Sequence, residues 1–382
     1  MLLTFALAAL TAPVLQDPAP APAPEPAAEE PAPDPFAPKP ITAIDVYGTF
    51  QGSGGVAEEL VRSRAGLAVG DLTDFDRDAV EARLRKLEGV RDVSVMTVLM
   101  PGAAIVMIGI DTSMSPRLAF LPEPTGAERL PAEMLQAYDR AGDLLMEGIL
   151  SGEGGEDVVD GYSVARYAPL AEAETALREL AQAQPDRVRG VLASSADAAH
   201  RIVAAKALAY MPDKAVVVRG LSGAMLDPDP TVRNNAVRAL GIFADWVVDM
   251  EAGPERERLV ALLGEHLSVG PLVTMLSSFE WTDRNKSAAL LARLVELPLP
   301  SVHAAVRAEG LMALGEMASW SSRGHALFST RILANLAGRD VMEAYAADEA
   351  ARGAGTLDTF VGGLVRAAEA AGVEPEPAPS ER

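Results

Sequence analysis

Three stretches in the second half of the chain share one motif, and this repetition constrains the fold more than any other feature. The run RNNAVRALGIFADW from Arg233 and the run RAEGLMALGEMASW from Arg307 both place Ala-Leu-Gly six residues after the arginine and Trp thirteen residues after it. The run RIVAAKALAY from Arg201 fits the same frame. The arginines are 32 and then 74 residues apart, and 74 is two units of about 37. Repeats of this length are typical of paired helices that stack into an α-solenoid.

The stretch DPDPTVRNNAVRALG marks the passage from one unit to the next. Asp229 is expected to cap the new helix, and Pro230 suits its first position because a proline has no N–H to leave unsatisfied there. The third unit is the weakest, since Gly270 stands where its arginine is expected and its first helix is short. We expect helix pairs at about 197–226, 229–267, 269–296, 300–337 and 339–371.

The same stretch resembles the HEAT repeat, including the HEAT-like repeats of bilin lyases, and the resemblance covers about residues 194–338. In that family an aspartate in the inter-repeat turn and an arginine six residues later form a ladder that joins successive repeats. The resemblance implies this role for Asp227 and Arg233. Serines stand six residues before Arg201 and Arg307, so the ladder is expected to be incomplete. Backbone carbonyls are the alternative partners of these arginines.

Two tryptophans occupy the same place in two of the repeats. Trp246 and Trp320 both end the first helix of their expected pair. This equivalence favours packing at the turn, while a binding role is the alternative because tryptophan is favoured at the energetic centre of protein interfaces.

A small α+β region precedes the repeats. ITAIDVYG alternates as a strand, two helical stretches follow, and Pro101-Gly102 separates two further strands. On those strands Val93 and Val95 share one face, as do Val106 and Ile108. The expected order is strand-helix-helix-strand-strand, so the predicted fold is multidomain: this small α+β domain followed by an all-α HEAT-like solenoid.

The runs ITAIDVYG, AGLAVGD and LRKLEGVRDVSV make residues 41–111 resemble the POTRA domain. POTRA domains are modules of envelope proteins found on assembly and secretion components and on a division protein. The resemblance implies polypeptide handling, in which an exposed edge strand accepts an extended peptide. The alternative is a stable fold that serves only as a spacer or docking block.

The remaining segments complete the expected organisation. Residues 1–16 have the apolar run of a secretory signal peptide, although the usual positive charge before it is missing; a frayed apolar N-terminus of a cytosolic protein is the alternative. Residues 17–40 form a Pro/Ala-rich, polyproline-like linker. The run SGEGGEDVVDGYS is predicted to be a loop without the ligand spacing of a calcium site. The other segments are a linker at 112–130, a helical cap at 131–194, the repeats at 195–371 and a disordered tail at 372–382.

The composition and the absence of catalytic and metal-binding motifs argue against nucleic-acid binding, metal binding and nucleophilic catalysis. The formal net charge is −21 and no Lys/Arg-rich run appears, which disfavours nucleic acid and anionic membrane surfaces as partners. No cysteine is present. The four histidines form no metal-ligand motif, and no serine lies in a nucleophile elbow. We therefore expect no catalytic residue, metal or cofactor.

These features together predict a non-enzymatic, exported protein-protein interaction scaffold of the cell envelope, located in the periplasm or associated with the envelope. Its expected partner is another polypeptide, and no transmembrane segment is expected beyond the signal peptide. One alternative is an accessory structural component of an envelope assembly or secretion machine. Another is a lyase-like enzyme built on HEAT-like repeats.

Overall fold

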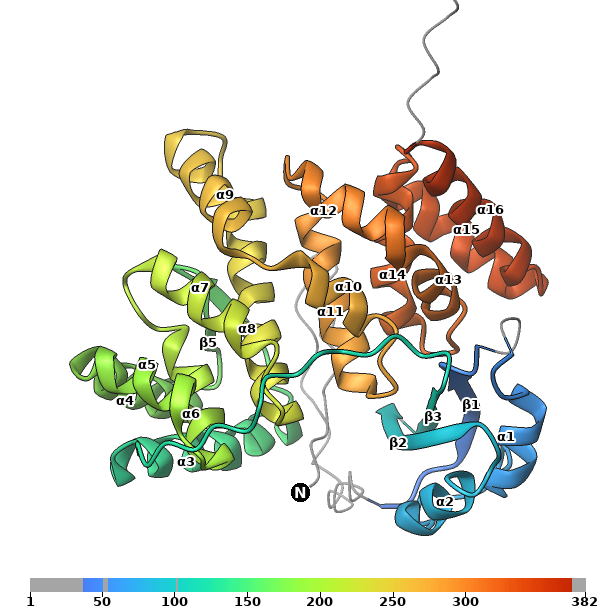
Figure 1. Cartoon of the computed structure of the whole chain (residues 1–382), viewed down its shortest axis with the longest axis horizontal. Coiled ribbons are helices and arrows are strands. Elements are labelled where there is room, and N and C mark those ends of the chain that lie inside the picture. Colours follow the sequence, from blue (N-terminus) through green and yellow to red (C-terminus); the bar gives the residue numbers. More distant parts are fainter. Residues whose placement is uncertain (1–36, 51–53, 101, 373–382) are drawn as a thin grey trace, which may run out of the picture.

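The computed structural model describes residues 37–50, 54–100 and 102–372. A small domain that contains a β-sheet lies against one part of a long curved array of helices (Figure 1). The expected signal peptide, most of the Pro-rich linker and nearly all of the C-terminal tail lie outside the described residues.

The N-terminal domain has the strand-helix-helix-strand-strand order expected from its sequence. Its three strands form one sheet in the order β1-β3-β2, in which the central β3 runs parallel to β1 and antiparallel to β2. The elements are β1 (Ile41–Tyr47), α1 (Glu58–Ala65), α2 (Arg77–Leu84), β2 (Val90–Met100) and β3 (Ala103–Thr112).

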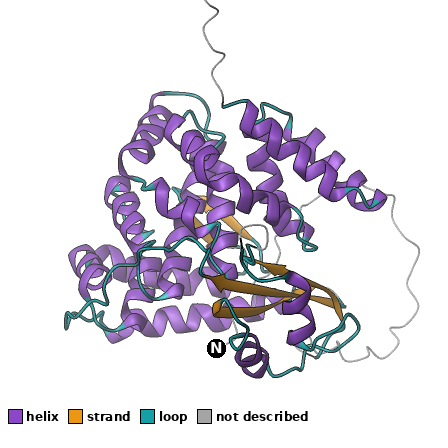
Figure 2. Cartoon of the chain, turned by 45° about the vertical axis from the view of Figure 1, so that its right-hand side comes forward, coloured by secondary structure: helices purple, strands orange, loops and turns teal. Residues whose placement is uncertain are grey.

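The sheet is buried on both faces, because side chains alternate along each strand. Val106 and Ile108 belong to a core that the sheet forms with α1 and α2. Met107, between them, belongs to the core shared with the helical repeats. Gly109 makes this second contact close, since a Cβ at this position would lie 1.9 Å from the carbonyl oxygen of Phe279. The sheet therefore lies between its own helices and the repeats (Figure 2).

The rest of the described chain is mainly helical. The helices are α3 (Ala132–Leu150), α4 (Ala168–Ala183), α5 (Pro185–Ser194), α6 (Ala198–Leu208), α7 (Lys214–Ala224), α8 (Pro230–Asp249), α9 (Pro254–His266), α10 (Val269–Met275), α11 (Trp281–Leu294), α12 (Pro300–Ala305), the π-helical turn η2 (Val306–Gly310), α13 (Leu311–Ala318), α14 (Arg323–Leu336), α15 (Val341–Ala354) and α16 (Leu357–Ala370).

The repeats form two rows of helices. In the first row α6, α8, α11 and α14 pack in succession, and in the second row α10 packs against α12 and η2, and α13 against α16. Arg233 lies in the first row, on α8, whereas Arg307 lies in the second row, on η2. The expected equivalence of these two arginines is therefore wrong. The Ala-Leu-Gly run that suggested the equivalence only indicates a helix that packs closely against its neighbours. Such helices occur in both rows, so the run does not identify the row.

The predicted loop within the cap region is in part a β-hairpin. Strands β4 (Glu156–Val159) and β5 (Tyr162–Ala165) pair in antiparallel fashion. Asp160 and Gly161 connect them with φ values of 50° and 77°. Asp-Gly is a strong signal for such a turn because both positions need positive φ. The neighbouring glycines and acids obscured this signal.

The predicted linker between the two parts is an extended segment bound to the helices. Residues 113–130, here called the strap, run from the end of β3 along the repeats to the start of α3 (Figure 1). Within the described part of the chain, we find no helix with the length and apolar character needed to cross a membrane.

Candidate functional site

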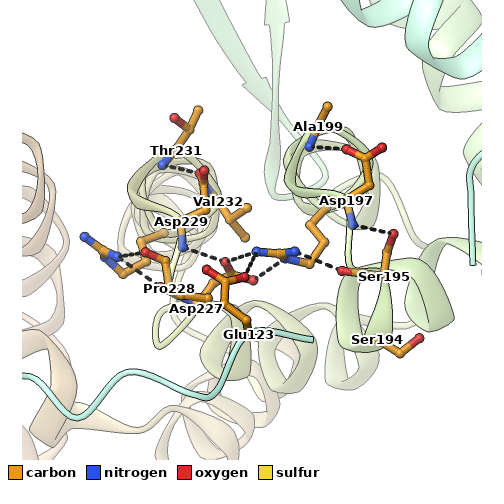
Figure 3. Close-up of polar contacts among 12 residues, drawn as sticks. Glu123, Ser194, Ser195, Asp197, Ala199, Asp227, Pro228, Asp229, Thr231 and Val232 are labelled. Carbon is orange, nitrogen blue, oxygen red and sulfur yellow. Dashed lines mark hydrogen bonds and ion pairs between the residues drawn. The ribbon is translucent and has the colours of Figure 1, made fainter. Parts of the chain in front are cut away.

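The first rung of an arginine ladder joins α6 to the turn before α8. The Arg201 side chain is fully buried. Its Nε and Nη2 donate to the two carboxylate oxygens of Asp227 at 2.8 and 2.9 Å, and its Nη1 donates to the carbonyl of Ser195 at 2.9 Å (Figure 3). Hydrogen bonding to Asp227 raises the pKa of Arg201 further above its ordinary value. Asp227 thus serves the arginine of the preceding repeat.

The second rung repeats this geometry one helix further along. Arg233 donates from Nε and Nη2 to the carboxylate of Asp283 at 3.1 and 2.9 Å. Its Nη1 donates to the carbonyls of Asp227 and Pro228, both at 3.0 Å. Asp229 caps α8 as expected, because its side chain accepts from two main-chain N–H groups of the first turn. Asp283 lies within α11 and not in the turn before it. The acceptor carboxylate of the second rung therefore comes from a different position in the repeat than Asp227 does.

The third rung was missed by the sequence analysis. Arg284 of α11 donates to the carbonyl of Ser278 and pairs with Glu316 of α13. Gly270 was taken as the position of the missing arginine, but the first-row helix of this unit is α11 and carries its own arginine. The signal lay in Arg284-Asn285, which repeats the Arg233-Asn234 pair at the head of α8.

In all three rungs the arginine donates to the carbonyl six residues before it, from Ser195, Asp227 and Ser278 respectively. A buried guanidinium needs several acceptors at once. The carbonyl at this fixed distance and the carboxylate from the next unit supply them. The regular geometry therefore depends on the turn's backbone as much as on its aspartate.

The outer side of each ladder arginine is covered by the N-terminal part of the chain. The Glu123 carboxylate of the strap lies 3.6 Å from Arg201. The Phe120 ring centre lies 4.2 Å from the guanidinium carbon of Arg233, and the Tyr47 ring centre lies 4.6 Å from that of Arg284. Cations over aromatic faces gain electrostatic attraction from the rings. The ladder is thus an internal seam and not an open surface.

Main-chain hydrogen bonds also hold the strap to the inter-repeat turns. Leu121 N–H donates to the carbonyl of Leu226 at 2.8 Å. Gly126 donates to the carbonyl of Ser194 at 2.7 Å and accepts from the N–H of Ala196 at 2.8 Å, which forms a parallel bridge. Main-chain bonds of this kind hold an extended peptide with little regard to its side chains. The inter-repeat turns of this solenoid therefore hold an extended segment of the same chain.

The free face of the N-terminal sheet docks on the same side of the repeats. The Tyr47 hydroxyl donates to the carbonyl of Phe279 at 3.0 Å, and its ring centre lies 5.4 Å from that of Trp320. The Asp45 carboxylate accepts from the main-chain N–H and the hydroxyl of Ser321 at 2.8 and 2.7 Å. Burial raises the pKa of Asp45 even though these hydrogen bonds lower it. The domain is fixed by polar and aromatic contacts together.

One edge of that sheet is partly closed by its own helix. Arg85, which directly follows α2, donates to the carbonyl of Val93 at 3.1 Å, and Val95 N–H donates to the carboxylate of Glu81 in α2 at 3.0 Å. These two main-chain groups of β2 point away from β3, where an added strand would have to pair. The carbonyl of Val93 and the N–H of Val95 are therefore already hydrogen-bonded and are not available to an added strand.

The two remaining predicted positions contact elements outside their own helices. Trp246 is half-buried and its ring centre lies 5.8 Å from both the Phe243 ring centre and the Lys214 ammonium. Arg307 donates to two main-chain carbonyls, that of Ala368 at 3.2 Å and that of Leu336 at 2.8 Å. Backbone carbonyls were the alternative partners expected for this arginine. Trp320 belongs to the interface with the N-terminal sheet, as described above.

Other sites of chemistry are sparse. Among residues 37–50, 54–100 and 102–372, no group of three or more His, Cys, Asp or Glu side chains could hold a metal ion. His325 is buried beside Trp281, with ring centres 4.8 Å apart. Burial, aided by the charge of Lys286, lowers the pKa of His325 to about 4.

Comparison with known proteins gives similarities over part of the chain. Residues 187–265, which run from α5 to α9, match the family model described as HEAT repeats. No curated protein matches the chain. A solved crystal structure described as an engineered protein is similar at 21% identity, with 52% of this chain and 90% of that chain covered and a TM-score of 0.35. HEAT repeats are typical of scaffolds for protein interaction.

Proposed function

We propose that this protein is a non-enzymatic scaffold that binds another polypeptide along its helical repeats. The observation that carries the proposal is the strap, an extended segment held by main-chain hydrogen bonds from the turns at 194–196 and 226. Because the strap occupies the inter-repeat turns, the partner is proposed to bind on exposed helix faces, such as those that carry Met312 on α13 and Met342 on α15. The HEAT repeats at 187–265 support the same class of function.

We further propose that the N-terminal domain is POTRA-like and acts here as a docking block. Its β1-β3-β2 sheet with β1 parallel to β3 supports the resemblance. Its firm contact with the repeats and the contacts of Arg85 and Glu81 on the β2 edge favour a docking role over capture of a peptide strand. This arrangement also suits an accessory structural component of an envelope machine, the second function we consider.

Export to the cell envelope, most simply to the periplasm, is part of the proposal. It rests on the apolar run in residues 1–16 and on the Pro-rich linker that follows. Sequencing of the N-terminus of the mature protein, recovered from envelope and cytosolic fractions, tests it. A protein found only in the cytosol with Met1 intact would overturn this part and leave the scaffold proposal standing.

Photo-cross-linking in cells tests the scaffold itself. A photoreactive amino acid is placed at Met312 on α13 or Met342 on α15, whose side chains are 61% and 70% exposed, and at Leu60 on α1 as a matched position of 45% exposure. We expect one or a few defined polypeptide adducts from a repeat position and none from Leu60. Adducts from Leu60 alone would assign binding to the N-terminal domain, and no adduct at any position would overturn the scaffold proposal.

A further inference from the structure

Basic side chains gather on one face of the helical region, around the β4–β5 hairpin. Acidic residues outnumber basic ones in this chain by 54 to 33, so a local group of cations is unusual. Each cation of the group comes from a different helix. They are Arg178 on α4, Lys206 on α6, Lys214 on α7, Arg238 on α8 and Lys286 on α11, here called the basic cluster.

Three carboxylates serve this cluster. Arg238 Nη2 donates to Glu156 at 2.8 and 2.6 Å, and Lys206 Nζ lies 3.1 Å from Glu174. Lys214 Nζ lies 2.9 Å from Asp160 at the hairpin turn. Arg178 donates instead to the hydroxyl of Tyr162. Without counting Lys286, the described residues of the cluster thus comprise four cations and three paired carboxylates, which is an excess of one positive charge.

The local electrostatics favour additional negative charge. Burial acts to raise the pKa of Glu156, but Arg238 and Lys206 outweigh it and hold this pKa below its ordinary value. Burial and the charge of Arg238 lower the pKa of Lys286 to about 8, while Glu156 opposes them. A carboxylate brought to this face would gain attraction from several cations in a partly desolvated place.

We propose that the basic cluster binds the chain's own acidic segment 25–34, EPAAEEPAPD. The charges are complementary, since the segment carries Glu25, Glu29, Glu30 and Asp34 and no basic residue. The segment lies outside the described residues. It is covalently attached, so its effective concentration at the cluster is on the order of millimolar, well above that of a free competitor.

The length of the chain limits which carboxylates can reach the cluster. Ala37 stands four residues before β1, and it is the far end of this strand, at Tyr47, that contacts Arg284 of α11, the helix that also carries Lys286. A polyproline II chain rises about 3.1 Å per residue, so full extension would place Glu25 up to roughly 37 Å from Ala37 but Asp34 only roughly 9 Å. The carboxylates farthest from Ala37, Glu25 to Glu30, are therefore the ones expected at the cluster. This inference does not depend on the scaffold proposal, because it concerns the chain's contact with itself.

Carbodiimide cross-linking of the full-length protein tests the contact directly. The reagent joins a lysine to a carboxylate that touches it, and equal amounts of ¹⁴N- and ¹⁵N-labelled protein separate links within one chain from links between chains. We expect an isopeptide bond within one chain between Lys206 or Lys286 and a carboxylate of segment 25–34. Links to this segment only between chains, or no link to it at all, would overturn the proposal.

Lysine reactivity gives a second measurement with a matched control. Neutralising the segment (E25Q, E29Q, E30Q and D34N together) should raise the acetylation rate of Lys286 several-fold, up to about tenfold for a pKa lowered by one further unit. The control neutralises Glu374 and Glu376 in the C-terminal Pro-rich run VEPEPAPSER and should leave the rate unchanged. Equal rates in both variants and in the unchanged protein would contradict the proposal.

Discussion

Replacement of Asp283 by alanine should destabilise the protein far more than the loss of an ordinary ion pair. The side chains of Arg233 and Asp283 are 3% and 1% exposed, and two hydrogen bonds of 3.1 and 2.9 Å join them. The variant leaves a buried guanidinium without its carboxylate, which costs about 3–5 kcal/mol of unfolding free energy. The carbonyls of Asp227 and Pro228 remain as acceptors but carry no charge, so they offset little of this cost.

The matched control is Glu255→Ala. Arg258 and Glu255 form a pair of similar geometry, at 2.7 Å, but their side chains are 56% and 55% exposed. Its loss should change the unfolding free energy very little, because water already screens the pair. The comparison therefore isolates burial as the cause of the difference.

Urea unfolding followed by circular dichroism measures both costs. We expect the midpoint of Asp283→Ala to fall well below that of Glu255→Ala, and the combined change of Arg233→Met with Asp283→Leu to recover most of the loss, since an apolar pair leaves no charge buried. A change of slope would show that the repeats no longer unfold together. If Asp283→Ala costs no more than the surface control, the ladder does not stabilise the fold in the way argued above.

Three further outcomes are expected. Gly161→Ala should speed hydrogen exchange of the hairpin amides and cost about 1–3 kcal/mol locally, because φ is +77° and the new Cβ would lie 2.8 Å from Phe243; unchanged exchange would argue against that contact. Tyr47→Phe should lower the unfolding free energy by about 1 kcal/mol in a denaturant titration through loss of the bond to Phe279. Because the folded pKa of His325 is about 4 and the unfolded one about 6.5, the contribution of His325 to stability should be constant above pH 6.5 and fall as the pH drops toward 4. The loss is about 3 kcal/mol; a His325→Gln variant should lose less between pH 7 and pH 4.5, and an equal loss would refute the assignment.

The sequence predicted those features whose signals are local. Alternation of apolar residues identified the strands of the N-terminal domain, and the chemistry of Asp229 and Pro230 identified the start of α8, because each pattern is formed within a few residues. The ladder motif was also visible around Arg233. What a local pattern does not contain is the row to which a helix belongs, and this is why Arg307 was grouped with Arg233 while Arg284 was overlooked.

The strap and the hairpin escaped prediction for two different reasons. The strap is extended, and the main-chain hydrogen bonds that tie it to the turns leave no periodicity in the side chains of residues 113–130. The hairpin did carry a turn signal at Asp160-Gly161, but its strands are only four residues long and lie between glycines and acids. The contacts of Phe120 with Arg233 and of Tyr47 with Arg284 join residues that are distant in sequence. No local sequence pattern predicts contacts of this kind.

The docking of the N-terminal sheet has a consequence for the order in which the chain folds. Asp45 and Ser321, which are bonded to each other, are separated by 276 residues, and Tyr47 and Phe279 by 232. Ribosomes release the domain first, yet the helices that cover its apolar face, which includes Met107, are made about two hundred residues later. Contacts between residues so far apart in sequence form slowly. Until they form, the apolar face of the sheet is exposed and favours aggregation. A nascent or truncated chain that ends before α11 should therefore depend on a chaperone until its missing helices arrive.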